Sequence, residues 1–291
     1  MAAVYYCDTD CELWYTRAEE QKIGVIKMPY TIDGKEYFYD LGRGMDFKDF
    51  YDRMRAGSTP TTSALNAEDY KKIFEPHFKK GEDILYVAFS SNMSATFNSM
   101  NMAVKELSAK YPGVRFECFD TLSICMGAGL PVYLGAKVFN ANGGDIDKTL
   151  EYLNNINPQI CVLFAVDKLT YLARGGRLSP AKAKIANLFN VKPILSVSKE
   201  GLIDVISKQS GNKKAMSYIV EEFKANYRDI DNAPIVIVSA DADEAAAELK
   251  KRVAEIAPAA EIWEQPVGPV IGAHCGPGTY GIIFTGTGRK S

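Results

Sequence analysis

The sequence predicts an α/β protein of two domains, and three observations lead to this prediction. The chain of 291 residues has the length of two domains of ordinary size. Residues 84–89 form a continuous apolar run, which is typical of a parallel strand covered on both faces. Strands and helices alternate over the first two-thirds of the chain, whereas a hairpin occurs later. We therefore expect a Rossmann-like N-terminal domain with a parallel sheet over residues 1–157, and a C-terminal α/β domain with a mixed sheet over residues 158–291.

The N-terminal part shows the signals of this strand–helix alternation. Gly34 marks a tight turn between two extended pieces. Asn66 can cap a helix that begins at Ala67, because its side chain can accept a hydrogen bond from a free backbone N–H group. The apolar and turn patterns place strands at residues 23–28, 84–89 and 114–119, and helices at residues 46–55, 95–110, 126–139 and 147–153.

The pattern changes in the C-terminal part. Lys199-Glu200-Gly201 separates two extended runs and predicts a hairpin. Ser179-Pro180 predicts the start of a helix, because Ser is a favoured cap and the missing N–H of Pro costs nothing at the first helical position. The helix expected at residues 181–189 either roofs a pocket or packs on its sheet. Further strands are expected at residues 160–166, 193–197, 202–207, 234–239, 261–265 and 280–285, and a helix at residues 243–256.

The composition argues against several classes of protein. Lys and Arg number 34 and Asp and Glu number 36, so the net charge of −2 gives no electrostatic footprint for nucleic acid. The sequence has no apolar run long enough to span a bilayer and no signal peptide, so we expect a cytoplasmic chain, with monomer as the default state. The six cysteines are expected to be reduced and mostly buried, and we expect neither a metal site nor a cofactor.

Residues 90–96 form the sharpest local feature. The segment SSNMSAT lies between the apolar strand and the following helix, where parallel-sheet proteins bind ligands. Free N–H groups and the positive dipole end at a helix N-terminus suit an anion, and the hydroxyls of Ser94 and Thr96 would add donors. The alternative is that Ser94 simply caps the helix, and this segment alone favours that alternative.

Three further segments contain candidate site residues. Residues 58–63 carry five hydroxyl residues around one Pro, which by themselves indicate a solvated loop. Residues 268–278 hold four glycines and two prolines around His274, so a functional and a structural role for this histidine are about equally favoured. Arg174 and Arg177 flank two glycines and could contact an anion or a partner, or be ordinary surface charge.

Together these segments resemble the DegV family, which includes the fatty-acid-binding subunits of bacterial fatty acid kinase. The segments TSALN, SSNMSATFNS, LARGGRLS and PVIGAHCGPG are similar to four family motifs in the family's order and span almost the whole chain. They begin at Thr62, Ser90, Leu172 and Pro269. Ala95 stands where the family has Gly.

The resemblance implies a long-chain fatty acid buried between the two domains. Its carboxylate would be bound by Thr62, Ser94 and His274, with the N–H of Ala95 nearby. Ser63, Thr96 and Gly272 would support this site, and Arg174 and Arg177 would serve a partner or a lid. No catalytic residue is implied.

The family role is to present the carboxylate to an ATP-dependent kinase subunit, which makes an acyl phosphate. The chain itself would then be no enzyme. Relatives often carry Arg at two positions that are here Ser210 and Asn212, in a region implied in docking the kinase. Two alternatives therefore stay open: a regulatory protein that senses a lipid or metabolite without a kinase partner, and a hydrolase that uses Ser94 and His274. Transient contact with a membrane surface also stays open.

Overall fold

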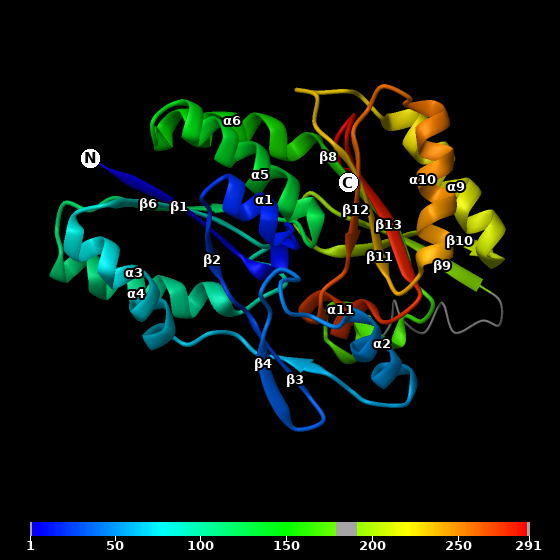
Figure 1. The fold of residues 1–291 in the computed structure, drawn as a ribbon, viewed down its shortest axis with the longest axis horizontal. Helices are drawn as coiled ribbons and strands as arrows, with labels where there is room; N and C mark the ends of the chain where they lie inside the picture. Colours follow the sequence, from blue (N-terminus) through cyan, green and yellow to red (C-terminus); the bar gives the residue numbers. More distant parts are fainter. Residues whose placement is uncertain (1, 179–190, 290–291) are drawn as a thin grey trace.

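The N-terminal region is built on a parallel four-stranded sheet. The computed structural model describes residues 2–178 and 191–289. The sheet has the order β2-β1-β6-β7, and all its pairings are parallel. Helices α5 and α6 cover one face and helices α3 and α4 the other (Figure 1). The strands are β1 (Ala3–Asp8), β2 (Gly24–Ile26), β6 (Asp83–Ala88) and β7 (Phe116–Asp120), and the helices are α3 (Ala67–Lys80), α4 (Thr96–Lys110), α5 (Met126–Ala141) and α6 (Ile146–Ile156).

The C-terminal region is built on a mixed six-stranded sheet of order β10-β9-β8-β13-β11-β12. Strands β11 and β12 pair in parallel and the other neighbours are antiparallel. Helices α9 and α10 lie on the outer face of this sheet (Figure 1). The elements are β8 (Ile160–Ala165), β9 (Val191–Val197), β10 (Ile203–Ser210), α9 (Gly211–Asn226), β11 (Ile235–Ala240), α10 (Asp243–Ile256), β12 (Ile262–Pro266) and β13 (Thr279–Thr285).

The six-stranded sheet has one core on each face. Ile235 and Ile237 of β11 pack in the cluster beneath α9 and α10. Their neighbours Val236 and Val238 belong to the large core cluster that also contains the N-terminal sheet. This alternation follows from the two-residue period of a strand. The inner face of the C-terminal sheet is therefore apolar and faces the N-terminal region.

A small antiparallel sheet and several short helices complete the architecture. The sheet has the order β4-β3-β5 and lies at the lower end of the molecule in Figure 1. These elements place loops from distant parts of the chain close together. They are η1 (Thr9–Cys11), α1 (Tyr15–Glu20), β3 (Pro29–Ile32), β4 (Lys35–Phe38), α2 (Phe47–Arg55), β5 (Thr61–Thr62), η2 (Asn157–Gln159), α7 (Thr170–Arg174) and α11 (Pro269–Cys275).

The predicted fold class is confirmed, as are several local predictions. Asn66 caps α3 as expected, because its side chain accepts a bond from the Asp69 N–H. The Asp69 carboxylate in turn accepts a bond from the Asn66 N–H, which completes a capping box. The hairpin around Glu200 joins the antiparallel strands β9 and β10. The proposed boundary between residues 157 and 158 falls inside η2 and stays a prediction. The helix expected after Ser179-Pro180 lies outside the described residues.

Two segments that were predicted as loops contain short regular elements. Residues 61–62 form strand β5, which pairs with β3, rather than part of a solvated loop. The segment around His274 contains helix α11, which begins with Pro269 at its first turn. Pro suits that position because its φ is already helical. The helix stops at Gly276, whose φ of 77° disfavours other residues. Helix α9 was not predicted.

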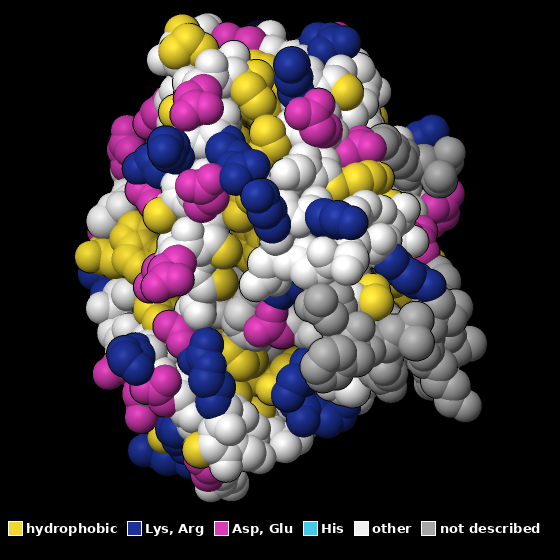
Figure 2. Space-filling view, turned by 90° about the vertical axis from the view of Figure 1, so that its right-hand side faces the viewer, with side chains coloured by type: hydrophobic (Ala, Val, Ile, Leu, Met, Phe, Trp, Pro, Cys, Tyr) yellow, Lys and Arg dark blue, Asp and Glu magenta, His cyan; other side chains and the backbone are white. Residues whose placement is uncertain are grey.

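The face that carries α9 and α10 has charged side chains of both signs. Acidic and basic side chains are interspersed over the face that carries α9 and α10 (Figure 2). One pair on this face joins Arg252 to Glu248 at 2.7 Å. Within residues 2–178 and 191–289, every helix is too short or too polar to cross a lipid bilayer.

Glu12 links the two regions at their centre. Its side chain is fully buried and accepts bonds from the Gly268 N–H at 2.9 Å and from the Tyr39 hydroxyl at 3.0 Å. Burial raises the pKa of Glu12 to about 8, although both hydrogen bonds oppose the shift. Gly268 is pressed against Tyr39, because a Cβ at position 268 would lie 2.3 Å from the ring Cζ.

We expect Gly268→Ala to destabilise the fold by about 1–3 kcal/mol, because the added methyl group overlaps the Tyr39 ring. Urea unfolding measures the loss. Gly44→Ala is the matched control, since the nearest atom to a Cβ there is an Asp40 oxygen at 3.4 Å. Its stability should stay within about 0.5 kcal/mol of wild type. Equal stability of both variants would contradict the close packing of Gly268.

Candidate functional site

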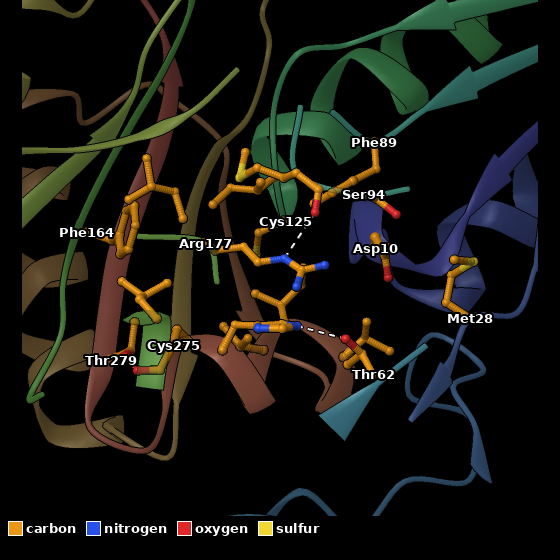
Figure 3. Close-up of a pocket in the computed structure, with 18 of the residues that line it drawn as sticks. Asp10, Met28, Thr62, Phe89, Ser94, Cys125, Phe164, Arg177, Cys275 and Thr279 are labelled. Carbon is orange, nitrogen blue, oxygen red and sulfur yellow. Dashed lines mark hydrogen bonds between the residues drawn. The ribbon is translucent and has the colours of Figure 1, made fainter. Parts of the chain in front are cut away.

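A cavity of about 170 Å³ lies between the two sheets. One side is the inner face of the C-terminal sheet, and the other is formed by loops that follow β6 and β7 (Figure 3). Loops at the carboxyl ends of parallel strands are the usual ligand sites of such sheets. Most of the lining is apolar. It includes Phe89, Ile124, Val162, Phe164, Ile203, Val238, Val270 and Ile283.

The polar lining side chains come from separate parts of the chain. Thr62 lies on β5, Ser94 precedes α4, His274 lies in the last turn of α11, and Arg177 follows α7. Asp10 also lines the cavity and lies in η1 just after β1. In Figure 3 the labelled members of this set converge on one region of the cavity, away from Phe164 and Thr279. We call this region the polar end.

Thr62 and His274 form a hydrogen-bonded pair at the polar end. Thr62 Oγ1 lies 2.9 Å from His274 Nε2. Burial lowers the pKa of His274 to about 4, and the positive charges of Arg177 and Arg174 add to the shift, so the ring is neutral at pH 7. His274 Nδ1 is buried without a hydrogen-bond partner among the described residues. Gly175 lies against it, since a Cβ there would be 2.0 Å from Nδ1.

This geometry assigns the proton of the His274 ring. A proton on Nδ1 would be a buried donor without an acceptor, whereas an unpaired nitrogen lone pair costs less. The proton therefore belongs on Nε2, which donates to Thr62 Oγ1. The Thr62 hydroxyl keeps its own proton, which it can donate to a group in the cavity.

Ser94 is prepared in the same way. Its Oγ accepts a bond from the Thr96 N–H at 3.3 Å, so its own O–H proton stays available. The N-cap of α4 is Ala95, which makes no side-chain cap bond, so the alternative that Ser94 is the helix cap is wrong. The contact of Ser94 with the Thr96 N–H is compatible with binding. Thr96 was also expected to support the site. Its hydroxyl instead pairs with Tyr70 at 2.6 Å, and Thr96 is not part of the cavity lining.

The two arginines of the Arg-Gly-Gly-Arg segment have different positions. Arg177 lines the cavity and donates to the Met93 carbonyl at 3.0 Å. Burial lowers the pKa of Arg177, and the carboxyl of Asp10 opposes this. Arg174 is exposed, and its guanidinium lies over the Tyr171 ring at 5.2 Å. The structure thus separates a cavity arginine from a surface arginine.

Some of the other expected residues line the cavity, and one does not. Ser63 and Ala95 line the cavity, as expected for residues near the polar end. Gly272 does not line it; it packs against Tyr51, where a Cβ would lie 2.5 Å from the hydroxyl oxygen. Gly272 therefore allows α11 to approach α2, which helps to position His274.

Sequence reasoning missed Asp10 as a site residue. Asp8, Asp10 and Glu12 alternate along one segment, and nothing local distinguishes them. The available signal was their place at the carboxyl end of β1, which neighbours β6 in the sheet. Only the structure shows that Asp10 is the member of the three that lines the cavity.

The fold and site define a class of α/β protein in which a buried, mostly apolar cavity ends in hydroxyl, imidazole and guanidinium groups. The model of the family described as "Uncharacterised protein, DegV family" matches residues 6–287. The chain is 33% identical to a DegV domain-containing protein of Clostridium perfringens over 99% of this chain and 98% of that protein. The chain therefore belongs to the DegV family.

Solved structures share this fold over 98% or more of the chain. A DegV family protein of Thermus thermophilus, whose structure is described as showing fatty acid binding, superposes with a TM-score of 0.83 at 25% identity, covering 98% of this chain and 100% of that one. A DegV lipid-binding protein of Thermotoga maritima gives a TM-score of 0.80 at 26% identity and covers all of both chains.

We expect the His274 ring to stay neutral down to a pH of about 4, and NMR of the ring protons measures this. The chain has two histidines, so a His274→Gln variant assigns the signals. Because the folded-state pKa lies below the ordinary value of 6.5, protonation favours the unfolded state, and stability should fall as the pH drops from 6.5 towards 4. Titration of His274 near 6.5 would contradict its burial beside two arginines.

Proposed function

We propose that this chain binds a long-chain fatty acid, with the carboxylate at the polar end and the acyl tail along the apolar lining. The observation that carries the proposal is the pair of hydroxyls at Thr62 and Ser94. Each accepts a bond from an N–H group and keeps its own proton to donate into one end of an apolar cavity. A carboxylate is an acceptor of several hydrogen bonds and fits this arrangement. The lipid ligands of the Thermus and Thermotoga relatives support the same class of ligand.

The acyl tail and the carboxylate contribute differently to the free energy of binding. Burial of a methylene group contributes roughly 0.8 kcal/mol, so about fifteen of them would contribute on the order of 12 kcal/mol before ordering costs. Much of this free energy would be lost if the charged carboxylate were buried without hydrogen bonds. The two hydroxyls and Arg177 prevent that loss. The tail therefore supplies most of the affinity, and the polar end sets the orientation.

A hydrolase is disfavoured by the contacts of the candidate nucleophile. A Ser–His nucleophile requires the hydroxyl to bond to the imidazole. His274 Nε2 is instead bonded to Thr62, and Ser94 bonds to the backbone N–H of Thr96. We therefore propose a carrier that does not itself catalyse a reaction.

We further propose that the carrier presents the carboxylate to an ATP-dependent kinase subunit. The polar end lies near the surface, because Ser63, Ala95 and Arg174 are exposed. A carboxylate held there would be the end of the ligand that a second protein can reach. In the proposed step a carboxylate oxygen attacks the γ-phosphorus of ATP, giving an acyl phosphate and ADP. The kinase supplies the nucleotide site.

The lipid proposal predicts that native protein carries a fatty acid, which organic extraction and mass spectrometry detect. Thr62→Val keeps the shape and removes the hydroxyl, so oleate affinity should fall by about tenfold, the equivalent of one buried hydrogen bond. Thr61→Val is the matched control, because Thr61 is exposed on the same short strand. Its affinity should equal that of wild type. Absence of any acyl species together with no binding of added oleate or palmitate would overturn the proposal.

The kinase proposal predicts acyl phosphate when loaded protein, ATP and a bacterial fatty acid kinase catalytic subunit are mixed. Hydroxylamine traps the product as a hydroxamate. The chain alone should give none. Thr62→Val should reduce the yield, because the carboxylate is less well oriented. Bound lipid without any product from the mixture would favour a sensor that acts without a kinase, in keeping with Ser210 and Asn212 where relatives often have Arg.

A further inference from the structure

Asp10 is a buried acid that the fatty acid site described above does not use. Its side chain is 5% exposed and lines the polar end, where it lies between Ser94 and Thr62 in the view of Figure 3. Its Oδ1 atom is buried and has no hydrogen-bond partner within the part of the chain that the structure describes. A carboxyl group in such a place is costly unless it has a partner or is uncharged.

The neighbouring acids of the same segment are satisfied by the protein. Asp8 accepts bonds from the Tyr86 hydroxyl at 2.6 Å and from the Phe89 N–H at 3.1 Å. Glu12 accepts bonds from Gly268 and Tyr39. Asp10 is therefore the acid of this segment whose hydrogen-bonding capacity faces the cavity.

The surroundings of Asp10 favour its neutral form. Burial raises its pKa well above the ordinary range, and the negative charges of Asp8 and Glu12 raise it further. Arg177 opposes these effects. A neutral carboxyl has an O–H group that can donate a hydrogen bond. The titratable groups that interact with Asp10 are Asp8, Glu12, Tyr70 and Arg177, and Cys125 and His274 line the same cavity.

We propose that Asp10 is a third hydrogen-bond donor to the ligand, and that its carboxyl shares one proton with the carboxylate of the bound fatty acid. This inference rests on the proposed function. Two carboxyl groups close together cannot both ionise without a large penalty, so one proton is held between them. Thr62, Ser94 and Asp10 then surround the head group with three O–H donors. Arg177 balances the one negative charge that remains.

The shared proton makes binding depend on pH. Asp10 holds its proton more tightly when the carboxylate is bound than it does in the free protein. Affinity should therefore stay constant while the free protein keeps this proton, and should fall as the pH rises beyond that range. A ligand acid that is already ionised throughout the range makes this effect visible.

The test compares Asp10→Leu with Asp10→Asn, using decanoate as a monomeric probe that is ionised above pH 6. At pH 7, Asp10→Leu removes the donor and should weaken binding at least about tenfold, the equivalent of one hydrogen bond. Asp10→Asn keeps an N–H donor and should stay within about threefold of wild type. Asp40→Asn changes an acid outside the cavity and should bind as wild type does. Thermal unfolding confirms that each variant is folded.

The second readout is the fall in decanoate affinity as the pH is raised from 7 until wild type begins to respond. It should be smaller in Asp10→Asn than in wild type, because an amide cannot lose the proton. Glu12 is unchanged in this variant, so any pH dependence due to Glu12 would persist. Equal affinity of Asp10→Leu and wild type at pH 7, or an equal pH response of Asp10→Asn and wild type, would overturn the inference. Failure of wild type to bind any fatty acid would instead overturn the proposed function.

Discussion

An anion placed at the end of an apolar cavity must be met by hydrogen-bond donors, and under the proposed function this constraint explains the arrangement of the polar end. Thr62 and His274 are 212 positions apart in the sequence, yet they form one hydrogen bond. Ser94 comes from a third segment and faces the same space. Thr62 Oγ1 is paired with His274 Nε2, and Ser94 Oγ accepts a bond from the Thr96 N–H. With the His274 proton on Nε2, each hydroxyl keeps a proton that it can donate to a group in the cavity.

The two sheets form the apolar cavity and position the polar residues at its end. The inner face of the C-terminal sheet and the loops after β6 and β7 supply an apolar cavity, and helices cover the outer faces. Glu12 ties the segment after β1 to the start of α11 through Gly268, and α11 carries His274. The same segment carries Asp10 into the polar end. One short stretch of chain therefore joins the two regions and contributes to the site between them.

Much of the fold could be predicted because its signals are local. The apolar run of β6, the Asn66 cap and the β9–β10 hairpin each follow from a few neighbouring residues. Helix α9 was not predicted, although Met216, Ile219, Val220 and Phe223 have helical spacing. Helix α11 was missed because its glycines also fit a loop.

The site was less predictable because its contacts join distant segments. Taken singly, Thr62 resembled a loop hydroxyl, Ser94 a helix cap, and His274 an even choice between structure and function. The family resemblance implied that these three residues lie together, and the structure shows the hydrogen bond between Thr62 and His274. Asp10 could not be separated from Asp8 and Glu12, because their difference lies in partners such as Tyr86 and Gly268. Those partners are 78 and 256 positions away.

The central claim is that the ligand's carboxylate lies at the polar end beside Thr62 and Ser94. Carbon-13 NMR of oleate labelled at its carboxyl carbon tests this claim most directly. The account predicts one bound carboxyl resonance, distinct from that of free oleate, which moves in Thr62→Val and in Ser94→Ala but not in Thr61→Val. A bound resonance that is identical in all four proteins would place the carboxylate elsewhere and contradict the account.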